Sequence, residues 1–337
     1  MNNKILETVK SFDELSVNPE VFISPSKNFR SRIEFGYKND SYTMMDGESQ
    51  IFFSKSNVPI NMISNNMESI LHDINCSITL KNKLFGINYR SNNVTTICTL
   101  IYHRPLDEKW LLEIKDIEDK YNNIFFVGRS KGKIYGSSNE YWSNVMLSNE
   151  TFWIKQDDES FFQPNFYLMP RMINFICKNL SIKYQSSNLL ELYCGCGTFT
   201  LPLSRYFNYV FATENNRKAI SHLHSSIKKN NFKNINIARL SDLETIEAFG
   251  GKTFRRLNNF DLKSYKFDTI LVDPPRSGLS PESIDFIKKF EQIIYISCNS
   301  ETFFRDLKLL NKKINKSAIF DQFVNTQHIE LIGILND

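Results

Sequence analysis

The feature that most constrains the fold is a regular alternation of apolar runs and helical patterns from about residue 156 to the end of the chain. The runs NLLELY, YVFATE, FDTILVD and IIYIS alternate with helical periodicities that include residues 169–180 and 218–229. Alternation of this kind favours a parallel sheet with helices on both faces. Ligands of such doubly wound sheets bind outside the carboxyl ends of the strands. The sequence therefore predicts an α/β domain over residues 156–337, with its site at that edge.

The first half of the chain has a different pattern. From Phe29 to Tyr37, apolar residues alternate with charged ones such as Arg32, which is typical of a sheet with one exposed face. The tripeptide Ser130-Lys131-Gly132 predicts a hairpin, and the segment ESILHDINCSITL has a helical pattern. We therefore expect an α+β region over residues 1–155.

Composition narrows the class of protein. A chain of 337 residues, 41% of them apolar, can build two domains with their own cores, and a net charge of +4 permits an anionic partner without requiring one. Because no stretch approaches the roughly 20 apolar residues of a membrane span, we expect a cytoplasmic protein with no membrane partner. Cys194 and Cys196 form a lone pair without nearby histidines, so neither a metal nor an iron–sulfur cluster is expected.

Two neighbouring strand ends suit a ligand that carries a ribose. Gly195 and Gly197 follow one apolar run, where the backbone can approach a ligand closely, although a simple tight turn explains them about as well. Glu214 ends the next run, where an acid can accept hydrogen bonds from ribose hydroxyls. A dinucleotide is disfavoured because the third glycine of its fingerprint is absent. S-adenosylmethionine, which has no phosphate, is the better candidate.

Two further strand ends carry reactive groups. Asp273 begins the rigid sequence Asp-Pro-Pro-Arg, which ends at Arg276, and Cys298 follows the run IIYIS directly. Beside a methyl donor, the thiolate could accept the methyl group itself, or it could attack a ring and make a distant carbon nucleophilic. The second role needs a base, and Glu330 beside His328 is the candidate.

Five segments of the chain resemble a known family: SFFQPN, LLELYCGCG, DLKSYKFDTILVDPPRSGL, IIYISCN and FDQFVNTQHIEL. In this order they are similar to the RNA uracil-5 methyltransferase family, and within it to the bacterial tRNA (uracil-5-)-methyltransferases. The likeness covers nearly the whole chain and is strongest from about Gln156 onward. It implies a Rossmann-like S-adenosylmethionine-dependent methyltransferase domain over residues 156–337, preceded by an α+β RNA-binding region over residues 1–155.

The resemblance also implies a mechanism. Cys298 is similar to the nucleophile that adds to C6 of uracil, after which C5 attacks the methyl group of S-adenosylmethionine, and Glu330 to the base that removes the C5 proton. The residues that the resemblance implies for the cofactor site are Gln163, Tyr193, Gly195, Gly197, Thr198, Glu214 and Asp273. The chain departs from the family pattern at Cys196, Ser300 and Gln327, none of which is the nucleophile or the base.

The implied substrate is the T-loop uridine at position 54 of transfer RNA, which becomes 5-methyluridine. Other RNAs with a T-loop-like fold are further candidates, and no obligate protein partner is inferred. Ribosomal-RNA members of the wider family typically carry a four-cysteine iron–sulfur cluster, for which this chain has too few suitable cysteines, and this favours the T-arm of tRNA. The candidate RNA contacts are Arg32, Phe85, Arg276 and His328, with Phe85 as a stacking residue.

Three alternatives stay open at this point. One is a ribosomal-RNA uracil-5 methyltransferase. Another is a methyltransferase for small molecules or amines, because Asp-Pro-Pro loops also serve N-methylation. The third is a tRNA-folding chaperone whose catalysis is dispensable.

Overall fold

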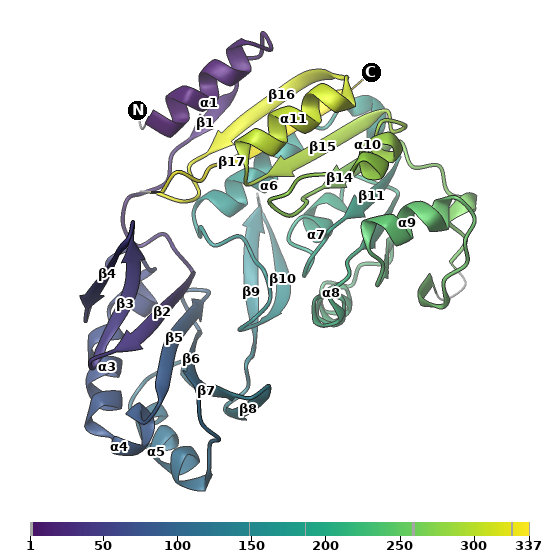
Figure 1. The fold of residues 1–337 in the computed structure, drawn as a ribbon. Coiled ribbons are helices and arrows are strands. Elements are labelled where there is room, and N and C mark those ends of the chain that lie inside the picture. Colours follow the sequence, from purple (N-terminus) through teal and green to yellow (C-terminus); the bar gives the residue numbers. More distant parts are fainter. Residues whose placement is uncertain (1–2, 148, 186, 258–259, 325, 337) are drawn as a thin grey trace.

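The computed structural model describes residues 3–147, 149–185, 187–257, 260–324 and 326–336. These residues form an eight-stranded sheet, a seven-stranded sheet and a two-stranded hairpin of β9 (Glu140–Leu147) and β10 (Glu150–Asp157). Figure 1 shows the hairpin between the two larger sheets, with the seven-stranded sheet at one end of the molecule. No helix in the described part of the chain has both the length and the apolar character needed to cross a membrane.

The eight-stranded sheet contains most of the carboxyl-terminal half. Its order is β1 (Glu20–Phe22), β16 (Lys313–Phe320), β17 (Glu330–Asn336), β15 (Gln292–Ser297), β14 (Thr269–Val272), β11 (Asn188–Leu192), β12 (Tyr209–Thr213) and β13 (Ile235–Ala238). Neighbouring strands run parallel except at β17, which is antiparallel to both β15 and β16. The carboxyl ends of β11, β12, β14 and β15 therefore meet at one edge, as the alternation predicted.

Helices cover both faces of this sheet. One core contains side chains of α6 (Leu168–Asn179), α7 (Thr200–Leu203), α8 (Arg217–Lys229) and the hairpin. The other contains side chains of α1 (Asn3–Asp13), α9 (Asp242–Phe249), α10 (Pro281–Ile287) and α11 (Ser300–Leu310). The predicted doubly wound α/β fold is confirmed. The sequence patterns did not predict β13, α9 or α11.

The seven-stranded sheet makes a separate core. Its order is β4 (Ser49–Phe53), β3 (Ser41–Asp46), β2 (Arg32–Lys38), β5 (Leu84–Ser91), β6 (Thr96–Tyr102), β7 (Ile124–Ser130) and β8 (Lys133–Gly136). The helices α2 (Asn61–Ser64), α3 (Met67–Cys76), α4 (Ile78–Lys81) and α5 (Glu108–Glu118) pack on it around buried residues such as Trp110. The predicted α+β character is confirmed, and so is the hairpin, in which Lys131 and Gly132 both have positive φ.

The predicted division of the chain at residue 155 needs a correction. Strand β1 pairs in parallel with β16, Glu20 opposite Ala318, so residues 20–22 complete the carboxyl-terminal sheet. Val145 and Phe152 of the hairpin belong to the same core as α6 and α8. The physical reason is that strand pairing is a long-range contact, which the local pattern of a three-residue strand cannot reveal.

Candidate active site

Cys298, Asp273 and Glu330 lie together at the carboxyl edge of the eight-stranded sheet. Cys298 follows β15 by one residue, and Asp273 follows β14, which pairs with β15 in parallel. Glu330 is the first residue of β17, in which Leu331 pairs with Ser297 of β15. The antiparallel register therefore puts Glu330 at the position opposite Cys298. The structure brings together the two residues that the sequence singled out for chemistry.

The two carboxyl groups of this cluster favour their protonated forms. Glu330 is 2% exposed, and burial, together with the neighbouring Asp273 carboxyl, raises its pKa well above the usual value, whereas Arg276 opposes the shift. Burial also raises the pKa of Asp273 to about 7. Desolvation favours the neutral acid, and two close carboxyl groups resist carrying two negative charges. Near neutral pH this pair is therefore able to hold a proton, as a general acid–base site requires.

The Cys298 thiol lies between acidic and basic neighbours. Burial raises its pKa, the Glu330 and Asp273 carboxyls raise it further, and the charge and hydrogen bond of Arg276 lower it. The side chain of Asn299 donates a hydrogen bond of 3.1 Å to the Arg276 backbone oxygen and accepts one of 3.0 Å from the Glu301 N–H, at the start of α11. Asn299 thus ties the loop that carries Arg276 to the residue next to the thiol. Arg276 is the cation that favours the thiolate.

The turn after β11 requires both of its glycines. Gly197 has φ of 90°, and a Cβ on it would lie 2.4 Å from Leu223 Cδ1 of α8. Gly195 has φ of 54°, and a Cβ there would meet nothing within 4 Å, so its backbone borders open space. The Gly195 N–H donates to Glu214 Oε2 at 3.1 Å, and the Asn216 N–H donates to Oε1 at 2.7 Å. Each carboxylate oxygen has a further lone pair, which suits ribose hydroxyls.

Tyr193 and Thr198 flank this turn. Tyr193 has φ of 60°, and its hydroxyl donates to Asp242 Oδ2 at 2.7 Å; Ser283 donates to the same oxygen at 2.9 Å. The Tyr193 ring is therefore held in place from α9 and α10. Thr198 is buried just before α7. An open glycine turn, a fixed acid and an oriented ring fit the adenosine part of S-adenosylmethionine.

Gln163 lies in the loop before α6 and is 3% exposed. Its Oε1 accepts a hydrogen bond of 2.9 Å from Gln322 Nε2, in the segment that leads to Glu330. Asn165 Nδ2 donates to the Gln322 backbone oxygen at 3.2 Å, and Asn165 Oδ1 accepts from the Leu168 N–H at 3.0 Å at the start of α6. The loop that carries Gln163 is thus bonded to the loop that carries the candidate base.

The chain matches the family model described as tRNA (Uracil-5-)-methyltransferase over residues 1–337. It belongs to this family.

Curated relatives also match this chain over almost its whole length. One from a Nitratiruptor species is 37% identical over 338 residues, which cover 97% of this chain and 92% of the relative. One from Acinetobacter baylyi is 37% identical over 350 residues, which cover 98% and 96%. Both are named tRNA/tmRNA (uracil-C(5))-methyltransferase. Family membership confirms the enzyme class and S-adenosylmethionine as the methyl donor.

A solved structure supports the fold. The crystal structure of Pyrococcus abyssi tRNA (uracil-54, C5)-methyltransferase in complex with S-adenosyl-L-homocysteine has a TM-score of 0.75 with this chain at 21% sequence identity. The match covers 99% of this chain and 83% of that one. Both sheets of this methyltransferase therefore have counterparts in a known structure. The roles of individual residues stay predictions.

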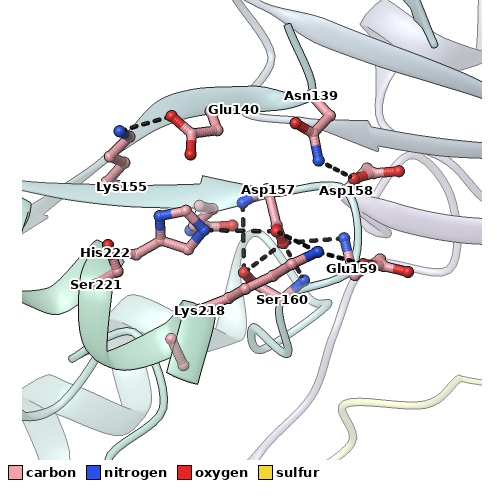
Figure 2. A network of polar contacts seen from close by, with 12 residues as sticks. Asn139, Glu140, Lys155, Asp157, Asp158, Glu159, Ser160, Lys218, Ser221 and His222 are labelled. Carbon is pink, nitrogen blue, oxygen red and sulfur yellow. Dashed lines mark hydrogen bonds and ion pairs between the residues drawn. The ribbon is translucent and has the colours of Figure 1, made fainter. Parts of the chain in front are cut away.

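Sequence reasoning missed the joint between the seven-stranded sheet and the site; Figure 2 shows the part of it around Asp157 and Asp158. Asp158 accepts hydrogen bonds from Asn139 Nδ2 at 2.7 Å and from Arg129 Nη2 at 2.6 Å. Asp157 lies 3.5 Å from His222 Nε2 of α8, and its Oδ1 accepts from the Ser160 N–H at 2.6 Å. Burial acts against ionisation of Asp157, but these bonds lower its pKa well below the usual value. The only signal in the sequence was the polar run QDDES after a strand.

Sequence reasoning also missed Glu191, an acid inside the apolar run NLLELY. It is 1% exposed in β11, and its Oε2 has no hydrogen-bond partner within the described part of the chain. Burial raises the pKa of Glu191 to about 8; the neighbouring Thr200 hydroxyl opposes this shift and the Asp273 carboxyl adds to it. Near neutral pH this carboxyl group, in the strand that leads into the glycine turn, therefore favours its protonated form.

The four candidate RNA contacts lie in different parts of this methyltransferase. Arg276 and His328 are exposed beside Cys298 and Glu330, and burial together with Arg276 and Lys4 lowers the pKa of His328. Arg32 pairs with Glu34 at 2.5 Å and lines a cavity of about 390 Å³ together with Phe161 and Phe323. Phe85 is 56% exposed on β5, where its ring stacks on His103 with centroids 4.4 Å apart. Arg32 and Phe85 both belong to the seven-stranded sheet, but only Arg32 shares a cavity with Phe323 of the segment that leads to Glu330.

No group of three or more His, Cys, Asp or Glu side chains in the described ranges is arranged to hold a metal ion. Cys194 and Cys196 are both buried, and burial raises the pKa of the Cys196 thiol to about 11. A neutral thiol of this kind packs as a small apolar side chain.

Proposed function

We propose that this methyltransferase transfers a methyl group from S-adenosylmethionine to C5 of the T-loop uridine at position 54 of tRNA, giving 5-methyluridine. The observation that carries the proposal is the position of Cys298 opposite the buried Glu330, at the ends of two paired antiparallel strands and at the same sheet edge as the glycine turn. The Pyrococcus abyssi protein of similar fold is named for uracil-54 and supports the choice of base. With tRNA as its substrate, we expect the enzyme to act in the cytoplasm.

Each residue of the cluster has a part in the proposed reaction. The Cys298 thiolate adds to C6, and the electrons of the C5–C6 double bond move towards the O4 carbonyl, which makes C5 nucleophilic. S-adenosylmethionine would supply an electrophilic methyl group: C5 forms the new C–C bond, and the S–CH₃ bond breaks with its electrons on the sulfur, so that S-adenosylhomocysteine leaves. The Glu330 carboxylate then removes the C5 proton, the double bond forms again and the thiolate leaves. Arg276, beside both groups, stabilises their negative charge.

The same proposal assigns the binding residues. Gln163, Tyr193, Gly195, Gly197, Thr198, Glu214 and Asp273 would hold S-adenosylmethionine. Arg32, Phe85, Arg276 and His328 would contact the T-arm, so the seven-stranded sheet would act as an RNA-binding domain. A flipped base has to leave its stack, and unpaired loop bases are the easiest to expose.

A mechanism-based trap tests the proposal. The protein is incubated with labelled S-adenosylmethionine and a T-arm transcript that has 5-fluorouridine at the T-loop position, and the products are separated under denaturing conditions. Because fluorine cannot leave as a proton, the covalent protein–RNA adduct should persist. We expect the adduct to disappear in Cys298→Ala and to remain in Cys177→Ala, whose thiol is partly buried in α6. Methyl transfer to normal RNA by Cys298→Ala, with no adduct in the unmodified protein, would overturn the ring-attack mechanism.

Competing substrates distinguish the alternatives. A ribosomal-RNA transcript that forms the adduct faster than the T-arm would indicate a ribosomal-RNA enzyme. Methylation of a small amine that survives Cys298→Ala would indicate the amine methyltransferase. Unchanged support of tRNA folding in the double variant Cys298→Ala/Glu330→Gln, without any adduct in the unmodified protein, would favour the chaperone.

A further inference from the structure

Lys4 of α1 is a buried lysine that is bonded to the segment between β16 and β17. Its side chain is 4% exposed, and Nζ lies 2.6 Å from Asp321 Oδ1. Nζ also donates hydrogen bonds of 2.8 Å to the Phe323 backbone oxygen and 3.0 Å to the His328 backbone oxygen. Lys4 therefore makes one ion pair and two hydrogen bonds to this segment.

The three acceptors lie at the two ends of the segment between β16 and β17. Asp321 follows β16 directly, and its N–H donates to the Phe22 backbone oxygen at 2.9 Å, at the end of β1. His328 comes two residues before Glu330, the first residue of β17. Lys4 therefore closes a loop whose last residues lead into the candidate base. A segment held at both ends by one cation has few alternative conformations.

Helix α1 also contacts the element that follows the nucleophile. The ring of Phe12 lies 5.9 Å from that of Phe303 and 4.9 Å from that of Phe304, both in α11. Helix α11 begins at Ser300, two residues after Cys298. Helix α1 thus packs against α11, which follows Cys298, and Lys4 of α1 bonds to the segment before Glu330. Figure 1 shows α1 beside α11 and β16.

A buried lysine is not the residue that stability alone would select. Removing an ammonium group from water is costly, and apolar side chains of similar volume often replace buried ion pairs without loss of stability. Phe12 already anchors α1 to the sheet through apolar contacts. The charged group of Lys4 does what an apolar side chain cannot: it holds two backbone oxygens and one carboxylate at defined positions.

We propose that Lys4 is a positioning residue, which holds residues 321–323 and 328–329 so that the Glu330 carboxyl is aimed at the C5 proton of the methylated uracil adduct. The inference rests on the proposed function and extends it to a residue that touches neither RNA nor methyl donor. In the step concerned, Glu330 takes the C5 proton, the C5–H electrons form the C5–C6 double bond, and the C6–S bond breaks with its electrons on Cys298. A displacement of about 1 Å can slow such a transfer about 100-fold.

Loss of Lys4 should slow the removal of the C5 proton but not the steps before it. Addition of the thiolate and methyl transfer do not need Glu330 as a base, whereas release of the product does. Loss of Lys4 should therefore leave a methylated covalent adduct that decays slowly, even on RNA with ordinary uridine. A residue that only stabilised the fold would lower all steps together and would not accumulate this species.

The test compares Lys4→Met with Lys10→Met, which removes an exposed lysine from the same helix. Each variant reacts in a single turnover with methyl-labelled S-adenosylmethionine and unmodified T-arm RNA, and quenched samples are separated under denaturing conditions. We expect Lys4→Met to form the labelled adduct at nearly the normal rate and to release product about 100-fold more slowly. Lys10→Met should match the unmodified protein, and affinity for S-adenosylmethionine should be unchanged in both variants.

A second variant decides the question if Lys4→Met does not fold. Asp321→Asn keeps the lysine and its two backbone bonds but removes the ion pair, so it should accumulate the same adduct to a smaller extent. Release at the normal rate in whichever of these variants folds would overturn the role of Lys4, provided that the unmodified protein forms the 5-fluorouridine adduct. Failure of the unmodified protein to form that adduct would instead reject the proposed function itself.

Discussion

Cys298 and Glu330 occupy opposite positions at the paired ends of two antiparallel strands, because Ser297 of β15 pairs with Leu331 of β17. A nucleophile and a base in such positions keep their spacing through backbone hydrogen bonds of the sheet. Site geometry of this kind is more rigid than that of two groups on separate loops. The arrangement suits a reaction in which one group enters at C6 of a ring and the other removes a proton from the adjacent carbon.

Arg276 should set the pH at which the thiol reacts. It lowers the pKa of both Cys298 and Glu330, so Arg276→Met should raise both. Because the thiolate is the nucleophile, the rate of adduct formation rises with pH, and the variant should need a higher pH to reach the same rate. Below its pKa, a thiol that is ten times weaker as an acid contains about tenfold less thiolate. The rate of 5-fluorouridine adduct formation, measured across neutral and alkaline pH with Lys308→Met as control, checks this; an unshifted profile would contradict it.

Glu191 should make the protein less stable as pH rises. Its folded-state pKa of about 8 is higher than the unfolded value of about 4.3, so the folded state binds the proton more tightly. This contribution to stability is complete below about pH 4 and is lost as pH rises towards 8. Glu191→Gln should therefore equal the unmodified protein at acidic pH and exceed it at pH above 8 by a few kcal/mol, because a tenfold difference in proton affinity corresponds to about 1.4 kcal/mol. Denaturant unfolding at several pH values measures this difference.

An exposed acid provides the comparison for Glu191. Glu282 of α10 is solvent-exposed, and Glu282→Gln should leave the pH dependence of unfolding as it is. If both glutamine variants had the same pH dependence as the unmodified protein, the buried carboxyl would be ionised in the folded state.

Alanine substitutions at the two glycines of the turn should differ in their effects on stability and on S-adenosylmethionine binding. Gly197→Ala puts a Cβ 2.4 Å from Leu223 Cδ1 at φ of 90°, so it should lower the free energy of unfolding by about 1–3 kcal/mol and weaken S-adenosylmethionine binding. Gly195→Ala meets no protein atom within 4 Å and should weaken binding about tenfold or more, with a smaller loss of stability. Calorimetric titration with S-adenosylmethionine and thermal unfolding separate the two effects. Equal affinities for all three proteins would show that the turn does not border the ligand.

Phe85 should contribute to RNA affinity alone. Its exposed ring on β5 offers a stacking surface, so Phe85→Ala should weaken T-arm binding by about 1–3 kcal/mol and leave S-adenosylmethionine binding unchanged. Leu112→Ala removes a similarly exposed apolar side chain from α5 and serves as the control. Filter binding at several salt concentrations measures both variants. Equal RNA affinity of Phe85→Ala and Leu112→Ala would remove Phe85 from the interface.

Arg129 should control how firmly the two parts of the molecule are joined. It donates a forked pair of hydrogen bonds to Asp158 and pairs with Glu159 at 2.8 Å. Arg129→Met leaves a buried carboxylate without its cation, so the segment 157–160 should become more sensitive to proteases and the KM for RNA should rise. Limited proteolysis and steady-state kinetics, with Lys131→Met as the matched control, check this. Unchanged cleavage in that segment would contradict the role of the joint.

Much of the site could be predicted from the sequence because its residues follow local rules. Apolar runs of strand length indicate where Asp273 and Cys298 emerge, and the glycines of the turn after β11 follow from backbone geometry. Glu330 was found as a polar residue at the start of an apolar run. The Asp157–Ser160 joint was not found, because acidic residues in a turn are usually solvated. Only contact with Arg129 and His222 makes these residues structural.

The sequence by itself determined the alternation of strands and helices in the carboxyl-terminal half apart from β13, α9 and α11, the turn chemistry and the family, because periodicity, glycine and proline act over a few residues. Tertiary structure alone decided which sheet the first strand joins, that Lys4 reaches Phe323 and His328 across almost the whole chain, and that Glu330 and Glu191 are buried. These properties depend on contacts between residues far apart in sequence. The raised pKa values that the chemistry needs arise from that burial. The carboxyl groups become buried only when the strands have paired into the sheet and the helices have packed on it.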